Sequence, residues 1–172
     1  MRVREIMSSP VVTCPDRSRL NEVARAMWDH DCGSIPIVDQ DGRLRGIITD
    51  RDICMAAYTQ GKPIQEIPVG AAMAAHVLVC HVDDSLEMAG QLMREGQVRR
   101  IPVIDNDGRP AGIVSLNDVT RAAADQRRST VDREVVETMA AVGEPRLPTE
   151  RAGKAQAQPQ TPTQPQSRVL PA

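Results

Sequence analysis

Residues 35–52 read IPIVDQDGRLRGIITDRD, and residues 101–118 read IPVIDNDGRPAGIVSLND. The two stretches keep one register, because a single step of 66 carries residue 35 to residue 101 and every later position to its match. In each stretch a β-branched run leads through an Asp-Gly turn into a second β-branched run, which is the pattern of a tight antiparallel hairpin. A register that holds across so many residue types indicates a tandem repeat.

The repeat continues on both sides of the hairpins. Upstream, each copy has a short strand, predicted at Val11–Cys14 and Val77–Cys80. A helix follows it, since apolar residues recur at i, i+3, i+4 and i+7 from Leu20 and again from Leu86. We expect Ser18 to cap the first of these helices, Asp84 to cap the second, and Gly33 to close the first. Downstream, helices are predicted over about residues 50–58 and 116–126.

The repeats divide the chain. We assign residues 1–60 to repeat 1, 61–68 to a linker, 69–126 to repeat 2 and 127–143 to a C-terminal helix. Residues 144–172 are rich in Gln, Pro and Thr and almost free of large apolar residues, so they are expected to form a disordered tail.

Composition excludes several classes of function. The net charge is −2, and the chain has one Trp, one Tyr and no Phe, which argues against a nucleic-acid partner. No apolar run approaches the ~20 residues that span a bilayer, and Arg2, Arg4 and Glu5 leave no room for a signal peptide at the start. We therefore expect no membrane association and a cytoplasmic location. No nucleophile–base motif or phosphate-binding Gly-rich loop is present, so an enzyme is not expected.

Two copies of an apolar-Pro-apolar-apolar-Asp strand, each with a Gly-x-x-(Thr/Ser)-x-x-Asp close, resemble a pair of CBS domains, the Bateman module, here as a stand-alone protein. The resemblance covers about residues 1–126. It implies an α/β fold of two β-α-β-β-α units, packed sheet to sheet about a pseudo-two-fold axis with two clefts between them. Adenine nucleotides bind in these clefts in many members of the family.

The resemblance also implies site residues. In each cleft a hydroxyl and a carboxylate bind ribose, and the opposite unit supplies the adenine-facing strand and any phosphate ligand. The expected stronger cleft comprises Thr49, Asp52, Val79, Val98, Arg99 and Arg100. The expected weaker cleft comprises Ser115, Asp118, Thr13, Gly33 and Ser34, where the positions that match the two arginines are Gly and Ser. The arginine guanidinium can bind phosphate through two parallel hydrogen bonds, whereas Gly and Ser offer only neutral donors.

Simpler interpretations of the same residues remain open. Asp52 and Asp118 are also well placed as first-turn carboxylates of helices that Thr49 and Ser115 cap. Arg99 and Arg100 could be a solvated surface pair. Cys14, Cys80 and His81 are donors that zinc accepts, but no pair has zinc-finger spacing, so we expect buried reduced thiols and no metal.

The function expected from these observations is a regulatory, ligand-sensing module. It would need no cofactor, bind AMP, ADP, ATP or S-adenosylmethionine as a regulatory ligand, form a homodimer, and signal in trans to a partner protein. The alternative is a ligand-free module for dimerisation and protein interaction. A homodimer is expected because Ile53, Ala56 and Ala57, with Val119, Ala122 and Ala123, exceed what one small core needs.

Overall fold

The structure is a computed structural model of the chain, and it describes residues 1–126, 137–139, 141–142 and 169–170. The helices are α1 (Leu20–Asp29), α2 (Asp50–Gln60), α3 (Leu86–Gly96) and α4 (Leu116–Gln126), with 3-10 turns at Val3–Glu5, Ile64–Glu66 and Val69–Ala71. The strands are β1 (Cys14–Pro15), β2 (Ser34–Val38), β3 (Leu44–Thr49), β4 (Val77–Leu78), β5 (Cys80–His81), β6 (Arg100–Ile104), β7 (Pro110–Ser115) and β8 (Val169–Leu170).

Each repeat builds one three-stranded sheet. The strand orders are β1-β2-β3 and β5-β6-β7, with the first pair parallel and the second pair antiparallel in both. The hairpins were predicted correctly, and their turns use Gly42 and Gly108, both at φ 78°. The short strands differ from the prediction: the first begins only at Cys14, and the second is broken into β4 and β5.

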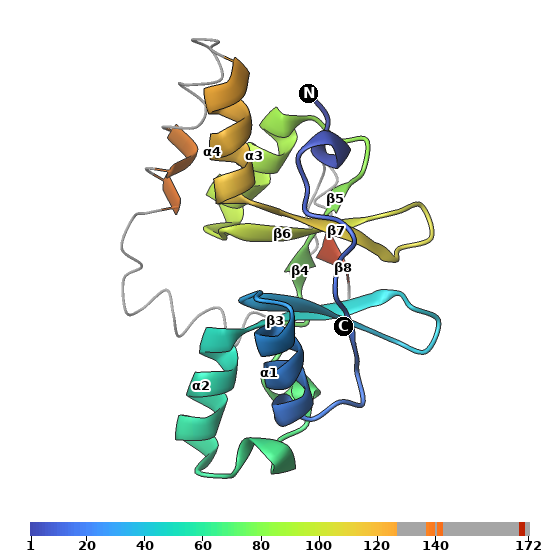
Figure 1. Ribbon diagram of the computed structural model, residues 1–172, viewed down its shortest axis with the longest axis vertical. Helices are drawn as coiled ribbons and strands as arrows, with labels where there is room; N and C mark the ends of the chain where they lie inside the picture. The colour runs from blue at the N-terminus through green and yellow to red at the C-terminus, as the bar shows by residue number, and fades with distance from the viewer. Residues whose placement is uncertain (127–136, 140, 143–168, 171–172) are drawn as a thin grey trace, which may run out of the picture.

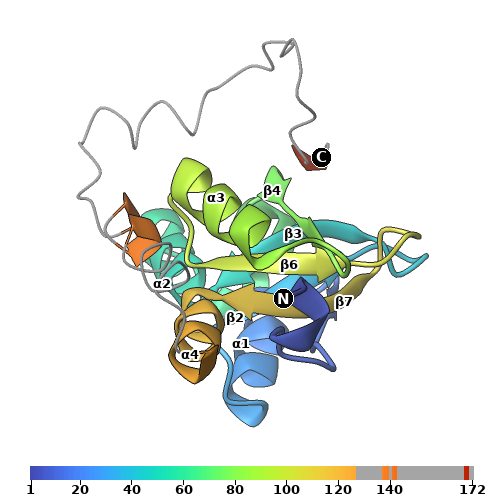
Figure 2. The same ribbon diagram turned by 90° about the horizontal axis from the view of Figure 1, so that it is seen from above.

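The two units pack sheet to sheet, with the helices on the outer faces (Figure 1). Four buried residues fill the space between the sheets: Leu44, Val77, Val79 and Ile104. Both hairpin turns lie at one end of the molecule (Figures 1 and 2) and contact each other through the Leu44 amide, which donates to the Gly108 carbonyl at 3.0 Å. The starts of α2 and α4 lie together on the opposite side. This arrangement is the predicted α/β fold of paired repeats.

The segment that precedes the first strand of each repeat packs on the other unit. Val3 is fully buried in the core of the second unit, and the Met7 Sδ lies against Gly112 of β7. In the same way Ile67 is fully buried in the core of the first unit, and the Met73 Sδ lies against Gly46 of β3. We call residues 1–8 and 64–74 the exchanged segments.

The exchanged segments join the opposite sheets by backbone hydrogen bonds. Ser8 and Ile113 form a bridge with N–O distances of 2.9 and 3.1 Å, and Ala74 and Ile47 form its counterpart at 2.9 and 3.1 Å. The Leu20 amide donates to the Ile67 carbonyl at 3.0 Å, so one exchanged segment also fixes the start of α1. Each three-dimensional core therefore contains residues from both repeats.

The predicted cap of α1 was wrong. Its N-cap is Arg19, whose backbone N–H donates to the Glu22 carboxylate at 2.7 Å, while Ser18 lies one residue earlier and is buried. The residue that takes a left-handed conformation after α1 is Asp31, at φ 48°, and not Gly33.

The predicted cap of α3 was also wrong by one residue. Ser85 is the N-cap and its Oγ accepts from the Met88 amide at 3.2 Å. The Asp84 carboxylate instead accepts from the His81 amide at 2.8 Å, inside the preceding turn.

The C-terminal region is described in part. Residues 137–139 and 141–142 are helical, and Thr138 and Val142 are buried against the second unit; the rest of the predicted 127–143 helix lies outside the described residues. Within the segment expected to be disordered, Val169–Leu170 instead form β8, which pairs antiparallel with β4. No helix in the described part of the chain is both long enough and apolar enough to cross a bilayer.

Candidate functional site

Thr49 and Asp52 stand where β3 passes into α2. The Thr49 hydroxyl donates to Asp52 Oδ2 at 2.7 Å, and the Thr49 amide donates to the same oxygen at 2.9 Å. In return the Asp52 amide donates to Thr49 Oγ1 at 3.3 Å, which closes a capping box. Asp52 is half-buried, and no described residue donates to its second oxygen, Oδ1. One carboxylate oxygen is therefore open at a helix N-terminus, where partial positive charge gathers.

Ser115 and Asp118 repeat this geometry between β7 and α4. The Ser115 hydroxyl and amide donate to Asp118 Oδ2 at 2.6 and 2.9 Å, and the Asp118 amide donates to the Ser115 hydroxyl at 3.2 Å. The second pair differs in one contact, because Arg121 donates to Asp118 Oδ1. The Asp118 side chain is only 5% exposed.

Arg100 reaches from the second unit to the first. A Cβ on Gly33 would lie 3.6 Å from Arg100 Nη2 and 3.3 Å from Asp50 Oδ2, so the guanidinium and this carboxylate both border Gly33. Asp50 directly follows Thr49 and begins α2. Arg100 therefore lies on the side of the molecule that holds Thr49, and a shared ligand cleft of the two residues stays a prediction.

Arg99 and Arg100 also adjoin the second hydroxyl. Both line a pocket of about 410 Å³ together with Ser115, Leu116, Asn117, Met139 and Val142. In the β6–β7 ladder Arg100 is directly opposite Ser115. Both arginines were predicted at the first cleft alone, whereas they also border Ser115 of the second pair.

The remaining predicted residues are spread between surface and core. Val79 is 2% exposed in the cluster between the sheets, and Val98 packs against the second core at the end of α3. Ser34 is buried opposite Thr49 in the β2–β3 ladder, while Thr13 is exposed just before β1.

Cys14 and Cys80 are buried and Cys32 is half-buried, whereas Cys54 is exposed on α2. Burial raises the pKa of the Cys14 thiol, with smaller contributions from Glu22 and Cys32. Burial likewise raises the pKa of Cys32, which a backbone hydrogen bond at Ser34 and, less, the charge of Arg100 partly offset. In the described ranges no group of three or more His, Cys, Asp or Glu side chains is placed to hold a metal, and this includes Cys14, Cys80 and His81.

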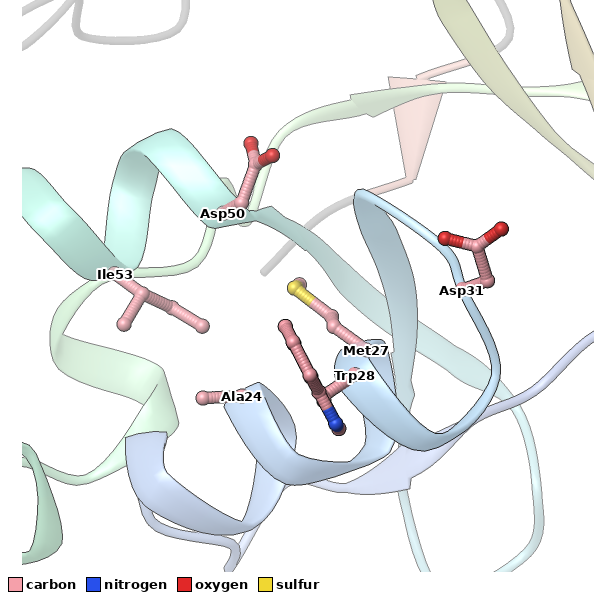
Figure 3. Close-up of a pocket in the computed structure, with 6 residues that line it drawn as sticks. All are labelled: Ala24, Met27, Trp28, Asp31, Asp50 and Ile53. Atoms are coloured by element: carbon pink, nitrogen blue, oxygen red, sulfur yellow. The ribbon is translucent and has the colours of Figure 1, made fainter.

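A second pocket, of about 290 Å³, lies between α1 and α2 and was not predicted. It is lined by Ala24, Met27, Trp28, Asp31, Asp50 and Ile53. Figure 3 shows the apolar side chains from the two helices facing one another, with the two carboxylates beside them. Trp28 is 87% exposed, and its helix position directly after the buried Met27 is the one sequence signal that places it at the edge of the apolar stripe.

Comparison with known proteins identifies the family. The model of the CBS domain family matches residues 3–58 and again residues 66–125. The CBS domain-containing protein YhcV of Bacillus subtilis is 38% identical over 117 residues, which is 68% of this chain and 81% of that protein.

Solved structures share the fold. Hypoxic response protein I, crystallised with two coordinated zinc ions, is 33% identical with a TM-score of 0.64, covering 70% of this chain and 98% of that one. The CBS domain pair of protein MJ0100, crystallised with 5′-methylthioadenosine and S-adenosyl-L-methionine, is 28% identical with a TM-score of 0.67, covering 74% and 98%. Together with the two matches of the family model, this likeness places the chain in the CBS domain family, with two CBS domains in tandem.

Proposed function

We propose that this protein is a regulatory module that binds an adenosyl ligand, of the AMP, ADP, ATP or S-adenosylmethionine class, and signals its presence to a partner protein in trans. Thr49 and Asp52 bind the ribose, and Arg100 binds a phosphate or another anionic group on the same ligand. The protein is not itself a catalyst in this proposal, and it works in solution as a homodimer.

The observation that carries the proposal is the open oxygen of Asp52. Its carboxylate is held rigid by two donors to Oδ2, while Oδ1 is left without a described donor. A ribose diol presents two O–H donors, and the open Oδ1 has two lone pairs to accept them. The Arg100 guanidinium, beside Gly33 and Asp50, supplies positive charge at the edge of the same region.

The relatives support the ligand class. The CBS domain pair of MJ0100, at 28% identity, binds two compounds that share an adenosyl group and differ in what its 5′ carbon carries. An adenosyl group is the part that Thr49 and Asp52 would recognise here. The group at the 5′ position then decides how much Arg100 contributes.

The test is calorimetric titration with AMP, after a thermal-shift screen with AMP, ATP and S-adenosylmethionine. A ligand at 100 times its Kd raises the free energy of unfolding by about 2.7 kcal/mol. Asp52→Ala should weaken AMP binding about ten-fold to a hundred-fold, the value of a charge-assisted hydrogen bond of roughly 1.5–3 kcal/mol. Asp39→Ala is the matched control, because the Asp39 carboxylate also accepts two backbone N–H bonds but lies in the hairpin turn. Absence of binding by the unmutated protein would overturn the proposal.

A second candidate is a ligand-free module for dimerisation and protein interaction. It is favoured by two exposed aromatic residues. Trp28, which lines the apolar pocket between α1 and α2, is 87% exposed, and Tyr58 on α2 is 81% exposed. Exposed aromatic residues around a hydrophobic pocket are typical of protein contacts. A dimer that binds none of the three ligands in the screen would favour this candidate.

A further inference from the structure

The two hydroxyl–carboxylate pairs have the same hydrogen bonds and differ in one cation. In both, the carboxylate Oδ2 accepts from a hydroxyl and from a backbone amide, with corresponding distances that differ by no more than 0.1 Å. Among the described residues, a guanidinium holds Oδ1 only in the second pair, where Arg121 donates to Asp118. Arg121 stands three residues after Asp118, and the residue three after Asp52 is Met55, which has no charge to offer.

The two carboxylates differ in how many acceptor positions they leave free for a ligand. An ionised carboxylate has about four lone-pair positions. Two donors occupy Asp52, so two positions remain for the two hydroxyls of a ribose diol. Three donors occupy Asp118, so only one position remains. The Asp118 side chain is also only 5% exposed.

Lack of room does not explain the difference. The pocket beside Ser115 has a volume of about 410 Å³, within the range of small-molecule sites, and two arginines line it. The second site therefore has space, a hydroxyl and positive charge. What it lacks is a second free acceptor position on the Asp118 carboxylate.

We propose that Arg121 closes the second adenosyl site by occupying Asp118, so that the protein binds one ligand per chain, at Thr49 and Asp52. This inference rests on the proposed function and adds which of the two sites operates. The Arg121 side chain is 74% exposed, so it can leave Asp118 without unpacking the core. In this proposal the second site keeps its pocket and its hydroxyl, and only the ion pair of Arg121 with Asp118 prevents it from binding a ligand.

The first test replaces Arg121 by methionine, the residue at the matching position of the first repeat (Arg121→Met). Calorimetric titration with AMP should give about one ligand per chain for the unmutated protein and about two for the variant. Arg121→Lys is the matched control, because a lysine at the same position still pairs a cation with the Asp118 carboxylate. This variant should bind one AMP per chain. Melting temperatures without ligand, measured for both variants, establish that each is folded.

The reciprocal test closes the first site. Met55 is 46% exposed on α2, so Met55→Arg can reach Asp52 as Arg121 reaches Asp118. The ligand must then displace a charge-assisted hydrogen bond, which should weaken AMP binding roughly ten-fold to a hundred-fold. Met55→Gln, of similar length and without charge, should bind as the unmutated protein does.

The outcomes separate this inference from the proposed function. Two AMP molecules per unmutated chain, or one per Arg121→Met chain, would overturn the inference and leave the proposed function standing. Equal affinities for Met55→Arg and Met55→Gln would also overturn it. If no variant binds AMP, the proposed function fails and the inference fails with it.

Discussion

The substitution Gly112→Ala should destabilise the protein, because the added methyl group would lie too close to the exchanged segment of residues 1–8. A Cβ at this position would lie 2.6 Å from Met7 Sδ and 2.9 Å from the Ser8 carbonyl oxygen. The sulfur can turn away, but the carbonyl cannot move freely, because it accepts from the Ile113 amide at 3.1 Å.

Overpacking of this kind costs about 1–3 kcal/mol. For a chain of this size each kcal/mol lowers the melting temperature by about 2–4 °C, so Gly112→Ala should melt about 2–12 °C lower. Gly46→Ala should behave alike, since its Cβ would lie 2.7 Å from Met73 Sδ and 2.9 Å from the Ala74 carbonyl oxygen.

Thermal unfolding followed by circular dichroism measures this effect. Gly70→Ala is the control, because a Cβ there meets nothing within 4 Å and the same change should be neutral or slightly stabilising. Equal melting temperatures for Gly112→Ala and Gly70→Ala would refute the packing of the exchanged segment on the opposite sheet.

Four further outcomes are expected. Arg100→Ala should weaken AMP binding about ten-fold or more and leave adenosine binding unchanged in calorimetric titration, since adenosine has no phosphate; parallel losses for both ligands would contradict the assignment. Deleting residues 144–172 should change the melting temperature little, because β8 contributes only a two-residue pairing with β4; a loss of several degrees would show a larger contribution. Trp28→Ala should shift the protein from dimer toward monomer in light scattering at micromolar concentration, and a monomeric unmutated protein would contradict the predicted homodimer. The free energy of unfolding should fall above about pH 9, because the folded pKa of Cys14 is raised from its ordinary value of 9.0 and the unfolded thiol releases its proton first; Cys14→Ala should flatten that decline in urea titrations, and an unchanged slope would exclude this cause.

Local signals in the sequence predicted the regular elements well. The Asp-Gly turns located both hairpins, and the apolar spacing located α1 and α3, because these features depend on residues close together in the chain. The caps were missed by one residue because tertiary contacts choose among neighbours. At α1 the Leu20 amide donates to Ile67, which lies 47 residues away. At α3 the Asp84 carboxylate is already used by the turn that holds His81.

The two hydroxyl–carboxylate pairs were predicted from the sequence, while their role in ligand binding stays a prediction. The repeat register identified Thr49 with Asp52 and Ser115 with Asp118, and the structure gives both pairs the same hydrogen bonds. The ion pair of Arg121 with Asp118 was missed, although its i,i+3 spacing on a helix could have indicated it. The packing of Met7 against Gly112 could not be predicted, because a repeat register shows which residues are alike and not which copy they pack against.

The exchanged segments mean that neither repeat contains all the parts of its own core. A chain that ended after α2 would lack Ile67 and Met73, and its β3 would carry an empty groove above Gly46. Its own residues 1–8 would have no Gly112 to cover. Such a half-chain could complete its core only with a segment from another chain. The covalent joint between the repeats therefore keeps together two halves whose cores each include a segment of the other.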